Sequence, residues 1–385
     1  MVEKLKYYPL HWMDGMKINK SHFTAIQNFV SDAVRDVVGA QISPVNYGLL
    51  PINNSIEIKL TSDQHKQLKV TVEQCHGITP NGSRIEISAE EQAVFQSSFL
   101  TEATYMMKED ENVKLMVCLS VHLFNRIPFG EPDPDENPPR YPFTRPEYIL
   151  QLIPENELKG PLGLGGSNLT VARISVSAGE CEIDPMYIPA CQCTMSHNTL
   201  KKFYVETERF FNQMELLASQ IRQKIRFKKQ NNLLSLIVDD MADKVVCYLG
   251  MEMNRYRWTA LYQPPIYMFS SVIALGRILK NCIEVYTGSG KEELINYVTE
   301  WCNIGQGDFE FAFSDILNEE YDHQQIGKTA EKVGRFMKTA EEIFNVLSQL
   351  DYIGKKRDGS IFISERPGDK DAIIHSKRNQ SFLAD

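Results

Sequence analysis

The feature that most constrains this fold is a change in hydrophobic periodicity near residue 195. From about residue 43 to 195, apolar residues alternate with mixed ones, as in "NVKLMVCLSVHLFN", which is typical of strands with one face in a core. In "LTVARISV" the alternation slips between Val171 and Ala172, which predicts a β-bulge. Many short strands with turns between them predict a β-sandwich within residues 1–195.

Beyond residue 195 the spacing becomes helical. Apolar side chains follow one stripe from Leu200 to Ile225, with Ser196 or Asn198 as the candidate N-cap. We therefore predict an α+β, multidomain protein in which an N-terminal β-sandwich is followed by a helical bundle at 196–350. Its further helices are expected near 232–257, 264–286, 290–303 and 324–350.

The last of these helices has apolar residues at alternating spacings of four and three, which is a heptad seam. Such a seam either closes the bundle of one subunit or joins copies of the chain. We take five of its residues as candidates for an oligomer seam: Ile326, Val333, Met337, Phe344 and Leu347.

Composition excludes several classes of protein. With 385 residues, 43% apolar and 24% charged, the chain has the composition of a globular protein of two or three domains. We find no apolar run of about 18 residues and no signal-peptide core, so we expect no membrane insertion and a cytoplasmic location. The net charge of −9 argues against nucleic acid as a ligand and favours protein partners.

The motifs of catalysis and metal binding are missing from the sequence. We find no G-x-S-x-G elbow and no H-E-x-x-H pair. Cys181, Cys191, Cys193 and His197 are four soft ligands within a short stretch, but no C-x-x-C pair closes a zinc site, and buried thiols explain them equally well. We expect no enzymatic activity, no metal and no cofactor.

A proline-rich segment interrupts the strand pattern at 127–146. Proline fixes φ and cannot donate a hydrogen bond to a neighbouring strand, so a long loop is predicted there. The loop is either a passive surface excursion or an arm that wraps a partner.

The opening segment "HWMDGMKINKSHFTAIQ" concentrates large aromatic residues near the start of the chain. Trp12, Phe23 and Phe29 can either bury against their own subunit or anchor in a partner. The segment resembles the entry motif W-x-E-G-M-x-L-x-P-Q-H-F-x-x-Q of the TssK family, baseplate subunits of type VI secretion systems. The matching residues are Trp12, Gly15, Met16, His22, Phe23 and Gln27, with Asp14 in place of glutamate and Lys20-Ser21 in place of Pro-Gln.

Five further segments resemble TssK motifs in the same order along the chain. They are "SPVNYGLLPI", "CHGITPNGSRIEI", "LTVARI", "YIPACQCTMSHNTL" and "YDHQQIG", so that the resemblance covers most of residues 8–327. Tyr47 occupies the position of a tryptophan, and Asn81 that of an aspartate.

This resemblance implies a trimeric, non-enzymatic adaptor of the baseplate at the inner face of the inner membrane of a Gram-negative bacterium. It implies a shoulder that docks on the wedge proteins TssF and TssG, a helical neck, and a head that meets the membrane complex. The candidate wedge-docking residues are Trp12, Met16, His22, Phe23 and Gln27. A membrane-anchor component is a further candidate partner.

The C-terminus departs from the family pattern. Only about 35 residues follow Leu350, whereas a head domain needs roughly a hundred to bury its own core. We expect a short hairpin and a mobile tail at 351–385 and no separate head. Two other functions stay open: a phage-tail baseplate or receptor-binding protein, and a zinc-dependent enzyme built on the cysteine group.

Overall fold

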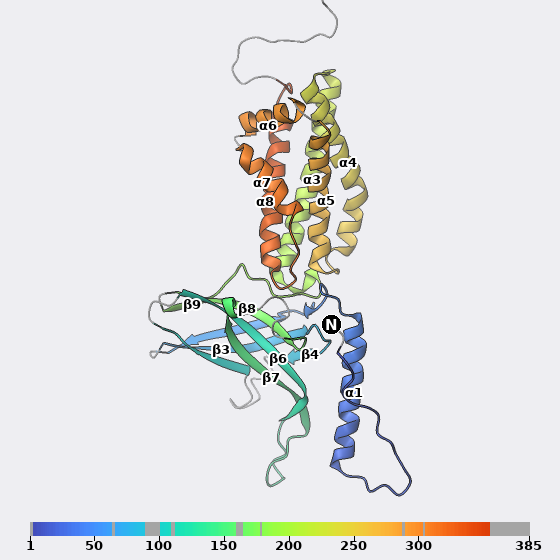
Figure 1. The fold of residues 1–385 in the computed structure, drawn as a ribbon, viewed down its shortest axis with the longest axis vertical. Helices are drawn as coiled ribbons and strands as arrows, with labels where there is room; N and C mark the ends of the chain where they lie inside the picture. Colours follow the sequence, from blue (N-terminus) through green and yellow to red (C-terminus); the bar gives the residue numbers. More distant parts are fainter. Residues whose placement is uncertain are drawn as a thin grey trace, which may run out of the picture.

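The computed structural model describes residues 3–63, 66–88, 101–108, 112–158, 165–177, 179–286, 289–302 and 305–354. In these residues, two antiparallel sheets are followed by a bundle of helices, which confirms the predicted α+β class. Figure 1 shows the bundle standing on one side of the sheets, with helix α1 (Lys20–Gln41) extending away from the bundle on the other side.

The first sheet is built around one long central strand. Strand β3 (Gln67–Ile78) pairs antiparallel with four others: β1 (Gly48–Leu49), β2 (Ile56–Ser62), β4 (Arg84–Ile87) and β5 (Thr101–Met106). Val70 and Val72 of β3 have no exposed surface and belong to the main hydrophobic core. The predicted period-2 pattern places these side chains on the buried face.

The second sheet has the order β7-β6-β8-β9, with β6 at Asn112–Phe129, β7 at Phe143–Pro154, β8 at Asn168–Ser177 and β9 at Glu180–Ile183. Leu115 and Leu119 of β6 are fully buried in the same core as β3. The register shifts where Val117 faces Ala172 but Cys118 faces Thr170, which leaves Val171 as an extra residue. The predicted bulge is therefore confirmed.

The predicted proline-rich loop at 127–146 is shorter than expected. Strand β6 continues to Phe129, which pairs with Phe143 at the start of β7, and Pro146 faces Arg126. Strand β7 lies at the edge of its sheet, where a residue without an N–H is tolerated. Residues 130–142 connect the two strands, and the first and last residues of the segment belong to the β6–β7 hairpin.

In its described residues, the second half of the chain forms the five expected helices and one further helix, α7 (Gln306–Leu317), which was not predicted from the sequence. They are α3 (Asn198–Phe227), α4 (Leu233–Thr259), α5 (Pro265–Val285), α6 (Ser289–Cys302), α7 (Gln306–Leu317) and α8 (Ile326–Gln349). The N-cap of α3 is His197, whose Nδ1 accepts a hydrogen bond from the Thr199 N–H at 3.3 Å, rather than Ser196 or Asn198. Helix α5 has the length and mean hydropathy (1.3) of a membrane-crossing helix, and half of its apolar window is buried inside the bundle.

The heptad seam of α8 closes the bundle of one subunit. The candidate oligomer-seam residues are between 0% and 7% exposed within the single chain: Ile326, Val333, Met337, Phe344 and Leu347. They pack in the core that α8 shares with the other helices. An association between copies therefore has to use another face, because these side chains are already covered.

The predictions for the C-terminus fall mostly outside the described residues. The hairpin, the mobile tail and the missing head concern residues 351–385, of which 351–354 are described. These four residues return to the bundle: the Gln230 side chain accepts a hydrogen bond from the Ile353 N–H at 3.1 Å, and Ile353 is fully buried.

A buried histidine joins the bundle to the sandwich. His323, between α7 and α8, is 4% exposed, and its Nε2 lies 2.9 Å from the carbonyl oxygen of Tyr47. Since a carbonyl can only accept, Nε2 carries the proton, and Nδ1 accepts from the Tyr321 hydroxyl at 2.8 Å. Neutral His323 is thus satisfied at both nitrogens.

Two glycines permit the close backbone approaches beside this histidine. Gly48 has φ +111° and lies so near the next segment that a Cβ would come within 2.0 Å of the Ala190 oxygen. Across the same approach, Leu49 donates to Ala190 and accepts from Gln192. At the start of α8, a Cβ on Gly327 would come within 2.1 Å of the Met186 oxygen. The junction therefore requires glycine at both positions.

We predict that His323 makes the protein less stable in acid. Burial lowers the pKa of His323 to about 4 from 6.5, so between these values the unfolded chain binds a proton that the folded protein does not. The free energy of unfolding should therefore fall by roughly 3 kcal/mol from this group as the pH drops from 7 to 4.

Urea denaturation at several pH values measures this effect. His323→Gln keeps a side-chain donor for the Tyr47 carbonyl but does not titrate, so its stability should depend less on pH in this range. Equal pH dependence in the two proteins would contradict the prediction.

Candidate protein-interaction site at the N-terminal helix

Helix α1 begins where the sequence supplies a complete capping box. The Asn19 side chain accepts a hydrogen bond from the Ser21 N–H at 3.0 Å, and His22 Nδ1 accepts from the Asn19 N–H at 3.2 Å. Both bonds satisfy backbone donors that a helix end otherwise leaves unpaired. His22, one of the predicted docking residues, thus has a local role in starting the helix.

The two faces of α1 are reversed relative to an ordinary surface helix. Its buried residues are mostly polar or charged: Asn28, Asp32, Arg35 and Gly39. Large hydrophobic side chains lie on the exposed side instead, namely Phe23, Val30, Val34 and Val37, which are 51–62% exposed. Because surface helices normally turn an apolar stripe inward, both faces need an explanation.

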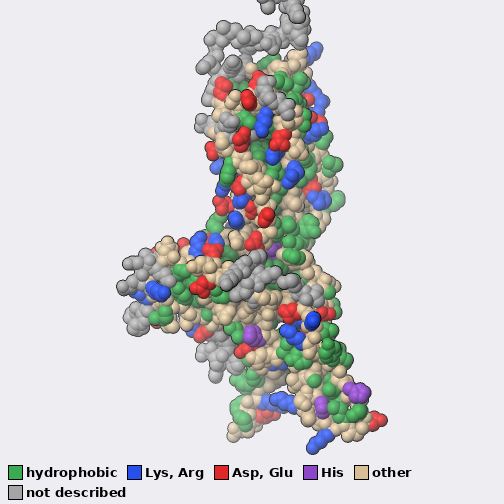
Figure 2. Space-filling view, in the orientation of Figure 1, with side chains coloured by type: hydrophobic (Ala, Val, Ile, Leu, Met, Phe, Trp, Pro, Cys, Tyr) green, Lys and Arg blue, Asp and Glu red, His purple; other side chains and the backbone are tan. Residues whose placement is uncertain are grey.

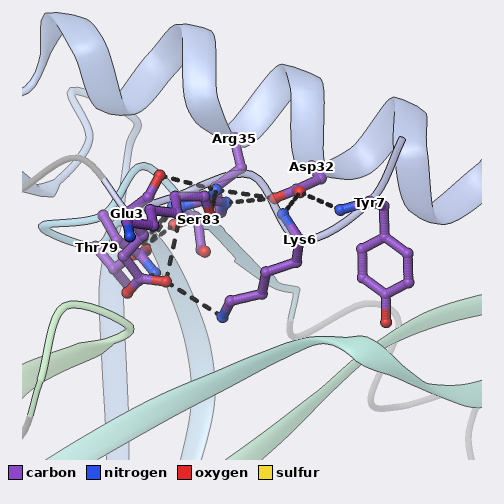
Figure 3. Close-up of polar contacts among 9 residues, drawn as sticks. Glu3, Lys6, Tyr7, Asp32, Arg35, Thr79 and Ser83 are labelled. Atoms are coloured by element: carbon purple, nitrogen blue, oxygen red, sulfur yellow. Dashed lines mark hydrogen bonds and ion pairs between the residues drawn. The ribbon is translucent and has the colours of Figure 1, made fainter. Parts of the chain in front are cut away.

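The buried face of α1 holds the N-terminal strap, residues 3–19. Asp32 has no exposed surface, and its Oδ2 accepts hydrogen bonds from the backbone N–H groups of Lys6 and Tyr7 at 2.5 and 3.0 Å. Arg35, 3% exposed, donates to the other carboxylate oxygen of Asp32 at 2.8 and 3.0 Å. Figure 3 shows these contacts between the strap and the helix.

The strap is also tied to the first sheet. Arg35 donates to the carbonyl oxygens of Glu3 and Lys4 at 3.5 and 3.4 Å. The Glu3 carboxylate accepts from the Asn81 side chain at 3.0 Å, in the turn between β3 and β4. One buried ion pair therefore connects α1, the strap and the sandwich (Figure 3).

These contacts keep the Asp32 carboxyl ionised. Burial opposes ionisation, but the N–H bonds from Lys6 and Tyr7 and the neighbouring Arg35 outweigh it and lower the pKa of Asp32. The pKa of Glu3 is lowered in the same way, against the effect of its burial, by Asn81, Lys6 and Arg35.

Two further contacts fix α1 in place. A Cβ on Gly39 would come within 2.8 Å of the Asn81 carbonyl oxygen. A Cβ on Gly82, at φ +90°, would come within 2.5 Å of the Gly39 nitrogen, so the turn and the helix backbone lie very close together. On the other side, Arg126 of β6 donates to the Ser31 hydroxyl at 2.7 Å. The helix is thus held at its C-terminal end and at its middle.

The predicted docking residues gather where the strap turns into α1. Trp12 is 48% and Phe23 58% exposed, Gln27 is exposed, and Met16 and His22 are half-buried. The rings of Trp12 and His22 lie edge to face with centroids 6.1 Å apart. For Trp12, Phe23 and Phe29 the sequence left open whether they bury against their own subunit or contact a partner. Phe29 is half-buried by its own subunit, whereas Trp12 and Phe23 are exposed.

Exposed apolar side chains concentrate on this part of the molecule. Besides the residues already named, Leu5, Tyr8, Met13 and Ile18 are 42–74% exposed. Figure 2 shows hydrophobic side chains along the region of α1 and around its free end. Contiguous exposed apolar surface marks a protein-interaction site, so this region is the candidate functional site.

The cysteine group forms no metal centre in the described part of the chain. Within those residues, no three His, Cys, Asp or Glu side chains come together in a way that could hold an ion. Cys191 and Cys193 are buried free thiols, and burial raises the pKa of Cys191.

No protein-family model matches the chain. No curated protein matches it either. Among solved structures, a crystal structure of TssK is similar at 15% identity and a TM-score of 0.48, over 86% of this chain and 68% of that one. TssK from the type VI secretion system of EAEC, in complex with a nanobody, is similar at 11% identity and a TM-score of 0.45, over 83% and 99% of the two chains.

A chain of a TssK–TssF–TssG baseplate subcomplex is also similar, at 12% identity and a TM-score of 0.43, over 86% of this chain and all of that one. At these identities and scores the likeness is one of general arrangement. The function proposed below therefore rests on residues and contacts of this chain.

We predict that Asp32→Asn releases the strap. The amide keeps the size of the side chain but leaves the buried Arg35 with only the more distant Glu3 carboxylate, at 3.8 Å. Removing one partner of a buried ion pair costs up to about 3–5 kcal/mol. Amide hydrogen exchange at Lys6 and Tyr7 should become much faster, while the helical half should keep its protection.

Asp36→Asn on the same helix is the matched control, because Asp36 is half-buried and lies outside these contacts. Wild-type protein should show the same release in acid: since the pKa of Asp32 is lowered by folding, its contribution is present above the ordinary value of 3.8 and is lost as the pH falls below it. Unchanged exchange in Asp32→Asn would refute this role.

Proposed function

We propose that this protein is a non-enzymatic structural adaptor of a type VI secretion baseplate, which docks on a TssF/TssG wedge and links it toward the membrane anchor. The observation that carries the proposal is that six TssK-like motifs occur in order and that their residues make specific contacts in the fold. A chance match would leave such residues scattered without contacts.

The motif contacts fall in two places. Tyr47 of "NYGLL" meets His323 of "YDHQQIG" at the junction of sandwich and bundle. Leu49 bridges to Cys191 of "YIPACQC". Asn81 of "TPNG" binds the strap, whose continuation carries the opening motif. Four of the six segments thus meet at these two joints of the molecule, and the opening motif follows the strap along the chain.

We propose that the docking surface for the wedge lies at the turn between strap and α1. Its residues are Trp12, Met16, His22, Phe23 and Gln27. Large exposed aromatic side chains supply contact area at a low cost in rotamer entropy and dominate many interfaces. This turn and the far end of the bundle lie at opposite ends of the long axis (Figure 1), which suits an adaptor between two partners.

Co-purification with the wedge proteins from the same gene cluster tests the docking surface. Trp12→Ala should weaken the complex by roughly 30-fold or more, because a central aromatic contact contributes about 2 kcal/mol or more. Trp258→Ala on α4 is the matched control, since Trp258 is also largely exposed, at 72%. Absence of any stable complex for the wild-type protein would sink the proposed function.

We also propose that the protein is a homotrimer. Light scattering on the full chain at micromolar concentration should give three times the 44.1 kDa of one chain. A 44.1 kDa particle at all concentrations would contradict a trimer but would not by itself exclude wedge binding.

A further inference from the structure

We propose that the outer face of α1 is a coiled-coil seam through which three copies of this chain associate as parallel helices. The α1 seam consists of Phe23, Gln27, Val30, Val34, Val37 and Gln41. This inference rests on the proposed homotrimer and names the residues that hold it together.

The spacing of the α1 seam is that of a heptad repeat. Its residues follow one another at intervals of four and three, and all six are exposed. At 100° per residue they fall on one narrow stripe, directly opposite Asp32 and Gly39 on the buried face. Such a narrow a/d stripe is the seam of a coiled coil rather than the broad apolar face of a globular helix.

The glutamines favour identical copies over an unrelated partner. With Phe23, Val30 and Val37 at d positions, Gln27 and Gln41 occupy a positions. In a parallel, in-register coil, equivalent a residues meet in one layer, so each glutamine faces glutamines and can exchange hydrogen bonds. Against an apolar partner the same amides would be buried without partners, which is unfavourable. A polar a position also fixes the register.

The hydrophobic residues favour more than two strands. Val34 at a and Val30 and Val37 at d are all β-branched, and β-branched residues at both positions shift coiled coils from dimers toward larger bundles. The g positions hold Ile26, Ala33 and Ala40, of which Ile26 and Ala33 are half-buried by their own subunit, so the exposed stripe stays narrow. No a, d, e or g side chain from Phe23 to Gln41 carries a charge, so the helices themselves meet without like-charge repulsion. A charge from outside the helix, the Arg126 guanidinium, lies beside the seam and donates to Ser31 at an e position.

The surrounding structure leaves this face open. Helix α1 lies at the margin of the molecule, with the sheets on its other side (Figure 1), and the strap contacts of Asp32 and Arg35 set which face points outward. The seam begins beside the proposed docking surface. Phe23 and Gln27 belong to both surfaces, because they would form the open end of the coil next to the Trp12 side chains of three copies.

The first test is Val34→Asp in the full chain, measured by light scattering across a concentration series. Trimer formation should weaken by roughly 100-fold or more, because three carboxylates would be buried together without partners. Circular dichroism should stay unchanged, since Val34 is 58% exposed within its own subunit. Val205→Asp on α3 is the matched control: Val205 is 60% exposed, and its substitution should leave the trimer intact.

A second test needs no destabilising change. Val37→Cys, in a Cys247→Ser background that removes an exposed native thiol, should form disulfide-linked pairs of chains on mild oxidation, because equivalent d residues meet in a parallel coil. Val205→Cys in the same background should not. Absence of these disulfides in Val37→Cys would overturn the parallel arrangement.

The remaining outcomes separate this inference from the proposed function. A trimer that survives Val34→Asp would overturn the α1 seam but leave the homotrimer standing. The wild-type protein could instead prove to be a monomer whose binding to TssF and TssG is abolished by Val34→Asp. That result would show that the seam takes a helix of a partner protein, which also overturns the inference. Loss of the wedge in Trp12→Ala with an intact trimer would support both.

Discussion

The position of the N-terminal helix depends on a carboxylate with no exposed surface. Asp32 accepts two backbone N–H groups from the strap and two donors from Arg35. A buried ion pair loses its hydration and is tolerated only when its hydrogen bonds are satisfied, so it restricts orientation strongly. Because Asp32 and Arg35 must face the strap, Val30 and Val34, on the opposite side of the same helix, must face outward.

The same principle operates at the junction between sandwich and bundle. Neutral His323 is satisfied only when Tyr47 and Tyr321 are both in place. Tyr47 follows the end of α1 by a few residues. In the connection between them, the Asn46 side chain accepts a hydrogen bond from the Ser43 N–H and donates one to the Gln41 carbonyl oxygen. The directions of α1 and of the bundle are therefore set through one short segment, which fixes the two ends of the molecule relative to each other.

The fold was predictable from sequence where the signal is local. Alternation revealed the bulge at Val171, and helical spacing located α4, α5 and α8 within a few residues. The strap contacts were not predictable, because Asp32 and Arg35 look like an ordinary surface pair three residues apart, and their partners are backbone groups 25–32 residues away. Heptad spacing alone also cannot distinguish a seam within one subunit from a seam between subunits. The residues from Ile326 to Leu347 proved to be the former.

The two heptad patterns differ in whether the subunit itself covers them. The apolar stripe of α8 is buried inside the bundle. Helix α1 turns polar residues inward and leaves its stripe in water, which costs free energy in an isolated subunit. Covering the stripe would therefore contribute favourable free energy. Since the buried face of α1 already holds the strap, α1 can gain a partner on its outer face without losing a contact within the subunit.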